Sequence, residues 1–322
     1  MNYNFSSDTQ GVEALAERYS AFKNEIARVI VGQDEVVAQL SLALFGGGHC
    51  LLVGVPGLAK TLLIQTVSKA LGLDFQRIQF TPDLMPSDIT GSEILNEQRK
   101  FEFQPGPLFA NIVLADEINR TPPKTQAALL EAMQEKAVTV AGKRYPLSKP
   151  FFVLATQNPI EQEGTYPLPE AQLDRFMFQL ELGYPSFDEE VQIVRQTTTD
   201  YSPELNTIMD GNLISAFQEL VRRIPVTDHV LEYAVGLVTK TRPFEPRADA
   251  LAKEYLSWGA GPRASQNLIL GAKAHAAMHG RFTPDIDDVK AIAAAVLRHR
   301  IVRNYKAEAE GVSESDIIRK LL

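Results

Sequence analysis

The sequence has little of what marks secreted, membrane-spanning or nucleic-acid-coating proteins. It contains one cysteine, Cys50, so no disulfide can form within the chain, which is typical of a reducing compartment. No apolar run is long enough to span a bilayer, and residues 1–8 lack the basic start of a secretory signal. The net charge of −8 argues against general binding to nucleic acid by phosphate neutralisation. We therefore expect a globular protein of the cytoplasm.

The remaining composition is ordinary for such a protein, with 45% hydrophobic and 22% charged residues among 322. That length allows about two domains. Up to about Gly183, short apolar runs alternate with helical patterns, which indicates a parallel α/β sheet flanked by helices. After Tyr184-Pro185 the pattern changes to helices, predicted over Glu189–Thr198, Asn212–Ile224, Asp228–Thr241, Ala248–Trp258, Arg263–His279 and Ile286–Arg298. We predict an α/β core over residues 1–183, an all-α lid over 184–322, and five strands at His49–Val53, Phe75–Phe80, Ile112–Ala115, Phe151–Ala155 and Phe176–Leu182.

A glycine-containing loop follows the first predicted strand and precedes a helical pattern. Gly54 and Gly57 would let the backbone turn tightly, so that its N–H groups, together with the positive end of the helix, bind phosphate oxygens. Lys60 can reach the β- and γ-phosphates of ATP or ADP, and the Thr61 hydroxyl can ligate Mg²⁺. The strict pattern has glycine where Ala59 stands, a change that suits a residue already in the first helical turn. The predicted nucleotide contacts are Gly54, Pro56, Gly57, Leu58, Ala59, Lys60, Thr61 and Leu62.

Two carboxylates end the third predicted strand and an amide follows the fourth. At the carboxyl edge of a parallel sheet these groups face the nucleotide site. Asp116 would help to hold Mg²⁺, and Glu117 would activate a water for attack on the γ-phosphorus. Asn158 would orient that water, although Asn-Pro is also a common turn starter.

Two arginines stand outside these stretches. Arg175 comes just before the fifth strand, where it would serve either as a finger for a neighbouring subunit's γ-phosphate or as a salt-bridge partner of Asp174 or Glu170. Arg263 lies in the first turn of a predicted helix, where a cation opposes the helix dipole. That unfavourable position suggests contact with a nucleotide phosphate.

These motifs together resemble AAA+ ATPases, and within them the MoxR family, whose loop is similar in carrying alanine at the Ala59 position. The matching stretches are Gly54–Thr61, Asp116–Arg120, Ala155–Pro159, Leu173–Phe176 and Gly261–Ala264. The resemblance implies that Val31 and Gly32 meet adenine, that Asn158 is the sensor-1 residue, and that Arg175 and Arg263 are the trans finger and the sensor-2 arginine. It also implies a helix-2 insertion at about residues 85–103 and a pre-sensor-1 hairpin at about 138–145.

The resemblance further implies Mg²⁺-dependent ATP hydrolysis by a homohexameric ring. Its role would be chaperone-like maturation or metal insertion, with a von Willebrand factor A domain protein as partner. Three alternatives are a nucleic-acid motor like the MCM helicases, a nucleotide-gated binding switch with little turnover, and a chelatase-type subunit. A basic cluster, Arg298, Arg300 and Arg303, would touch nucleic acid or an acidic partner, or simply form a solvated face or subunit contact.

Overall fold

A five-stranded, wholly parallel sheet forms the centre of the first part of the protein. The computed structural model describes residues 5–159, 164–200 and 203–322. The strand order is β2-β5-β8-β1-β9, and each predicted strand is found in it. The strands are β1 (Cys50–Gly54), β2 (Phe75–Gln79), β5 (Ile112–Asp116), β8 (Phe152–Gln157) and β9 (Phe178–Leu182).

Both faces of this sheet are covered, which is why its central strands are continuously apolar. Successive side chains point to opposite faces, so Leu52 and Leu114 join one buried cluster while Leu51 and Val113 join another. Helices α1 (Asp8–Ile26), α2 (Asp34–Gly46) and α3 (Lys60–Ala70) contribute to the first cluster, and α5 (Pro123–Glu135) to the second. The carboxyl ends of the strands therefore open at one edge of a rigid layer.

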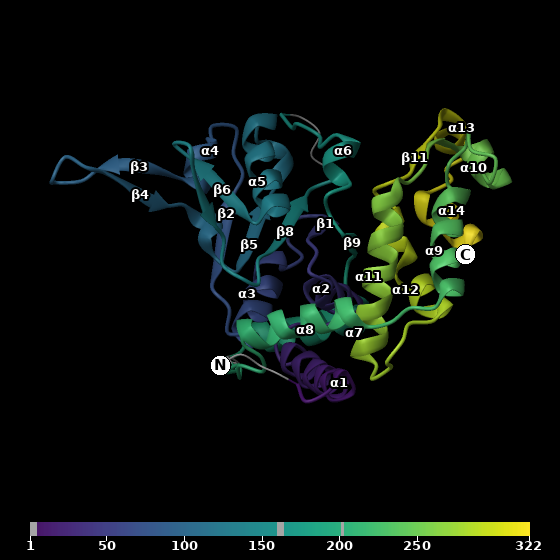
Figure 1. Cartoon of the computed structure of the whole chain (residues 1–322), viewed down its shortest axis with the longest axis horizontal. Helices are drawn as coiled ribbons and strands as arrows, with labels where there is room; N and C mark the ends of the chain where they lie inside the picture. Colours follow the sequence, from purple (N-terminus) through teal and green to yellow (C-terminus); the bar gives the residue numbers. More distant parts are fainter. Residues whose placement is uncertain (1–4, 160–163, 201–202) are drawn as a thin grey trace.

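Two hairpins project from the second face. The longer one pairs β3 (Gly91–Leu95) with β4 (Phe101–Pro105), follows the short helix α4 (Pro86–Thr90), and reaches away from the body of the molecule (Figure 1). The other pairs β6 (Ala137–Val140) with β7 (Lys143–Pro146). The Phe103 and Tyr145 rings stack with centroids 3.9 Å apart, and Lys143 Nζ lies 3.7 Å from Glu93 Oε1. The two hairpins thus contact each other at the middle of the β3–β4 ladder.

The second part is a helical lid, as predicted, with one short antiparallel pair of strands, β10 (Leu256–Trp258) and β11 (Val302–Arg303). The helix predicted over Ala248–Trp258 is shorter, because its last residues form β10. Helices α13 and α14 were not predicted. The helices are α7 (Phe187–Thr197), α8 (Gly211–Arg223), α9 (Asp228–Lys240), α10 (Ala250–Tyr255), α11 (Pro262–Met278), α12 (Ile286–Leu297), α13 (Tyr305–Ala309) and α14 (Glu314–Leu321).

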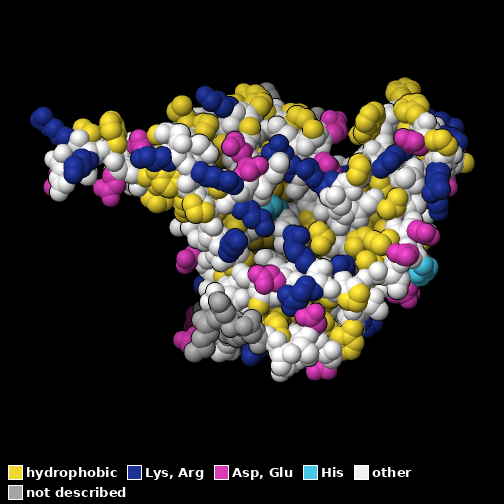
Figure 2. Space-filling model, viewed as in Figure 1, with side chains coloured by type: hydrophobic (Ala, Val, Ile, Leu, Met, Phe, Trp, Pro, Cys, Tyr) yellow, Lys and Arg dark blue, Asp and Glu magenta, His cyan; other side chains and the backbone are white. Residues whose placement is uncertain are grey.

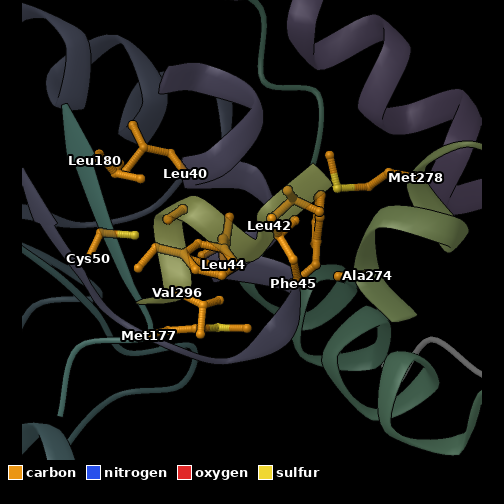
Figure 3. Close-up of a cluster of buried hydrophobic side chains, with 14 of the residues drawn as sticks. Leu40, Leu42, Leu44, Phe45, Cys50, Met177, Leu180, Ala274, Met278 and Val296 are labelled. Atoms are coloured by element: carbon orange, nitrogen blue, oxygen red, sulfur yellow. The ribbon is translucent and has the colours of Figure 1, made fainter. Parts of the chain in front are cut away.

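Helix α2 joins the two parts, because it is buried between the sheet and the lid helices. Figure 3 shows its side chains packed among those of β1, β9, α11 and α12. The labelled residues are Leu40, Leu42, Leu44, Phe45, Cys50, Met177, Leu180, Ala274, Met278 and Val296. Cys50 is fully buried here as a small core side chain. Within the described residues, none of the helices combines the length and apolar character needed to cross a bilayer.

Candidate active site

The predicted phosphate loop connects β1 to α3 and forms one wall of a pocket of about 400 Å³. The opposite wall comes from the ends of β5 and β8, as expected for polar groups at the carboxyl edge of parallel strands. Asn158 is buried there beside the two carboxylates. The lining residues are Pro56, Gly57, Leu58, Ala59, Lys60, Thr61, Asp116, Glu117, Thr156 and Asn158.

The backbone of the loop differs from expectation at two positions. Ala59 is not in the first helical turn but caps α3 in the left-handed region, with φ 54° and ψ 31°. The prediction for Ala59 was wrong, and the alanine carries a strain that glycine would avoid. Gly54 ends β1 rather than turning, and a Cβ there would lie 2.9 Å from the Leu182 backbone oxygen, so it permits close packing against β9. Gly57 has φ 85° and does supply the turn.

Lys60 begins α3 and lies across the loop. Its ammonium donates to the Gly54 carbonyl oxygen at 2.5 Å. Burial lowers the pKa of Lys60, while the carboxylates of Asp116 and Glu117 oppose that shift. A cation in this position, beside the amino end of a helix, attracts an anion into the pocket.

Asp116 and Glu117 are held by groups that the sequence analysis did not single out. Thr156 donates through its hydroxyl to Asp116 Oδ1 at 2.6 Å and accepts from the Glu117 N–H at 2.9 Å. Arg77 donates to Asp116 Oδ2 at 2.6 and 3.1 Å. Strand β2 pairs in register with β5, so that Gln79 lies opposite Asp116 and donates to Glu117 Oε2 at 2.8 Å.

Glu117 is the most constrained of these residues. Its φ of 57° and ψ of 50° place a non-glycine residue in the left-handed region, a strain that other contacts must support. Arg120 adds an ion pair, with Nε 3.1 Å from Glu117 Oε2. Gln79 and Arg120 both contact Oε2, so together they fix the orientation of the Glu117 carboxylate. The signal missed in the sequence was the alternation Arg77-Ile78-Gln79, which places both polar side chains on one face of an otherwise ordinary strand.

The segment predicted to meet adenine lies beside the loop without lining the pocket. The Gln33 side-chain amide donates to the Leu58 carbonyl at 3.4 Å, which brings Val31 and Gly32 near the loop. Gly32 has φ 73°. Leu62 lies in the first turn of α3 with its side chain 43% exposed, and it does not line the pocket.

The donor set suits a magnesium–nucleoside triphosphate complex. The loop offers a helix N-terminus and a lysine for phosphate, and a Cβ added at Gly57 would meet nothing within 4 Å, so the backbone there is open to a ligand. The Thr61 hydroxyl and the Asp116 carboxylate line the same pocket and are oxygen ligands of the kind Mg²⁺ prefers.

Arg175 and Arg263 lie elsewhere, together in a second recess of about 230 Å³. The recess is bordered by Gly46–Gly48, just before β1, whereas the phosphate loop follows β1. Arg175 likewise precedes β9, which runs parallel to β1. The recess therefore opens at the amino edge of the sheet. A five-residue strand at about 3.3 Å per residue separates the two edges by roughly 16 Å.

The local salt bridge considered for Arg175 does not form. Asp174 instead receives Arg263 Nη1 at 3.3 Å and Arg300 Nε at 2.7 Å. Within the described ranges, the Arg175 guanidinium has neither a hydrogen bond nor an ion pair, and Arg175 lines the recess. An arginine without a carboxylate partner is available to an incoming anion.

The basic cluster near the end of the chain is used inside the fold. The Arg300 side chain is 1% exposed and binds Asp174 together with carbonyls before β9 and in α12. Arg298 pairs with Glu181 at 3.1 Å and Arg303 with Glu314 at 2.7 Å. All three arginines of the cluster therefore form ion pairs within the fold.

Comparisons with known proteins found two matching families, similar sequences and a similar solved structure. A family described as "ATPase family associated with various cellular activities (AAA)" matches residues 49–178, and an AAA lid domain family matches residues 248–321. Chaperone MoxR1 of Mycobacterium tuberculosis is 43% identical over 97% of this chain and 84% of its own. Protein MoxR of Methylorubrum extorquens is 30% identical over 87% and 86%. The crystal structure of a Cytophaga hutchinsonii protein thought to be an ATPase superposes with a TM-score of 0.90, at 43% identity over 97% of this chain and 95% of that one.

Proposed function

Because the chain belongs to the MoxR family of AAA+ ATPases, we propose that it hydrolyses ATP at sites shared between neighbouring copies in a ring. Each site would join the phosphate-loop pocket of one copy to the arginine recess of the next. The reaction would be Mg²⁺-dependent and would drive a chaperone-like remodelling of protein complexes in the cytoplasm.

The observation that carries this proposal is the separation of the two halves of the site. The loop, carboxylates and amide gather at the carboxyl edge of the sheet, and Arg175 and Arg263 gather at the amino edge. Neither arginine lines the pocket of its own chain. A head-to-tail arrangement brings unlike edges together and closes into a ring when the rotation between copies allows.

Within such a site each side chain has a distinct role. Lys60 and the loop N–H groups would bind phosphate, and Thr61 and Asp116 would hold Mg²⁺, which neutralises phosphate charge. Glu117 would take the proton of the attacking water, oriented by Asn158. Arg175 and Arg263 of the neighbour would stabilise the charge on the transferred phosphoryl group, and such a finger changes the rate by on the order of 10³–10⁵.

Two further elements of the proposal come from the family resemblance. One is a homohexameric ring, and the other is a protein partner with a von Willebrand factor A domain. Co-migration of such a partner with the assembled protein in the presence of ATP would support the second element, and separate migration would count against it.

The test is the ATPase rate per subunit against protein concentration, with particle mass measured by light scattering in the same samples. The wild type should gain specific activity as it assembles, and Arg175→Ala should lose that gain while binding nucleotide normally. Arg195→Ala, on the exposed helix α7, is the matched control and should behave as the wild type.

Two other variants divide the roles within one chain. Glu117→Gln should bind ATP without turnover, and Lys60→Ala should weaken binding itself. Activity that does not depend on concentration or on Arg175 would overturn the shared site and favour a nucleotide-gated switch. Stimulation by DNA or RNA with a steep salt dependence would favour a nucleic-acid motor.

A further inference from the structure

The recess that holds Arg175 and Arg263 contains two more cations, Lys136 and Arg222, that have no role so far. Figure 2 shows Lys and Arg side chains gathered in the hollow between the core and the lid. The remaining lining residues are neutral: Gly46, Gly47, Gly48, His49, Met133, Gln134, Met177, Gln266, Asn267 and Leu270. His49 is uncharged at neutral pH, because burial lowers its pKa to about 4. Among the residues that the structure describes, no Asp or Glu lines the recess, although the chain has 40 acidic and 32 basic residues.

The cations of this recess repel one another. Burial lowers the pKa of Lys136, and the charges of Arg222 and Lys149 lower it further. Burial and Arg222 lower the pKa of Lys273 in the same way. In the part of the chain that the structure describes, the side chains of Lys136 and Arg222 have no hydrogen bond or ion pair. A group of like charges without counter-charges is stabilised when an anion enters.

Hydrogen bonds fix the backbone of both residues. Lys136 follows α5 in the left-handed region, its N–H donating to Ala132 O and its carbonyl accepting from the Leu147 N–H, both at 3.0 Å. Arg222 lies in the last turn of α8, and its carbonyl accepts from Lys273 Nζ at 3.2 Å. The ends of α5 and α8 thus meet the beginning of α11, which carries Arg263.

We propose that Lys136 and Arg222 are phosphate-contacting residues, so that the whole recess receives the phosphate chain of the ATP bound to the neighbouring copy. This inference rests on the proposed shared site. The occupant follows from the recess itself, since it already contains Arg175 and Arg263 and measures about 230 Å³. A nucleic acid requires an extended basic stripe rather than a single recess of this size.

Neutral substitutions of similar length test the two residues. Arg222→Gln and Lys136→Gln should each lower turnover of the assembled protein about 10- to 100-fold, the range expected for a lost charge-assisted hydrogen bond. ATP affinity of the dispersed protein should be unchanged, because the phosphate loop of the same chain is intact. Arg222→Lys should retain part of the activity, because it keeps the charge.

The control is the next residue. Arg223 lies in the same helical turn but pairs with Asp8 on the surface, with Nη2 2.9 Å from Oδ1. Arg223→Gln should therefore turn over as the wild type does. If Arg222→Gln and Lys136→Gln match Arg223→Gln while Arg175→Ala loses turnover, this inference fails and the shared site survives. If Arg175→Ala also has no effect, the proposed function itself fails.

A mixing experiment separates a contact across the interface from a structural defect. Arg222→Gln subunits keep an intact phosphate loop, and Lys60→Ala subunits keep an intact recess. In an equal random mixture of head-to-tail neighbours, about one quarter of the interfaces combine both intact halves. Recovery to about that fraction of wild-type turnover supports the inference. No recovery, with assembly shown by light scattering, overturns it.

Discussion

Replacing Arg300 is expected to loosen the lid and the segment that carries Arg175. The guanidinium is buried and donates to Asp174 Oδ1 at 2.7 Å and to the carbonyl oxygens of Asp174 at 3.1 Å and Met177 at 3.2 Å. It also donates to the carbonyls of Phe176 and Val296, each at 2.5 Å. One side chain therefore fastens α12 to the residues just before β9.

Arg300→Met keeps the length of the side chain and removes every donor. Breaking a buried ion pair typically costs about 3–5 kcal/mol, because the partner is left without compensation. We expect about 3 kcal/mol here, at the lower end of that range. The Asp174 side chain is 30% exposed and keeps Arg263 at 3.3 Å, which reduces the loss.

Urea unfolding followed by tryptophan fluorescence measures this change. Trp258 is the single tryptophan and lines the same pocket between core and lid as Arg300 and Asp174. With a slope of about 3 kcal/mol per molar urea, the midpoint should fall by about 1 M. ATPase activity should fall as well, since Arg175 directly follows Asp174.

Two other substitutions in the lid make the result interpretable. Arg319→Met removes an arginine whose side chain is 77% exposed, and it should change the free energy of unfolding by less than about 0.5 kcal/mol. Arg300→Lys should be intermediate, because an ammonium cannot reproduce the planar set of donors. A midpoint for Arg300→Met equal to that of Arg319→Met would refute the reasoning.

Three other predictions concern the core. Ala59→Gly should raise stability by about 1 kcal/mol in urea unfolding by relieving the left-handed φ, and a lower stability would show that the alanine is unstrained. Thr156→Val should lower ATP turnover about tenfold or more, because Asp116 loses a donor and the Glu117 N–H an acceptor; unchanged turnover would remove Thr156 from the site. Burial lowers the His49 pKa to about 4. The contribution of neutral His49 to the free energy of unfolding should therefore be complete above about pH 6.5 and decline by up to about 3 kcal/mol as the pH falls towards 4. Urea midpoints at pH 7 and 4.5 should therefore differ less in His49→Gln than in the wild type.

The sheet was predictable because strands buried on both faces are continuously apolar. The phosphate loop was predictable because binding phosphate and Mg²⁺ requires particular residue types at particular positions. Backbone conformation was less accessible. Ala59 reads as a good helix former, yet the loop geometry forces it to positive φ. The residues of the Ala248–Trp258 segment do not indicate that Leu256 pairs with Arg303, which lies more than forty residues later in the sequence.

The supporting contacts of the site depended on tertiary structure. Arg77 and Gln79 reach Asp116 and Glu117 only because β2 lies beside β5 in the sheet order. Lys136 directly follows α5 and Arg222 lies in the last turn of α8, and only packing brings them to the recess beside Arg175. Strand adjacency and helix ends are set by the whole fold, so such groups carry no local sequence signal.

The placement of the two halves of the site at opposite edges of one sheet has a numerical consequence for the proposed assembly. In an open row of copies, the first presents an unused recess and the last an unused phosphate loop. The row therefore has one complete site fewer than it has members, and closing the row creates the missing site without adding a subunit. Closure itself would then raise the ATP turnover of the assembly. A break at any one interface of the ring would lower it by the contribution of one site.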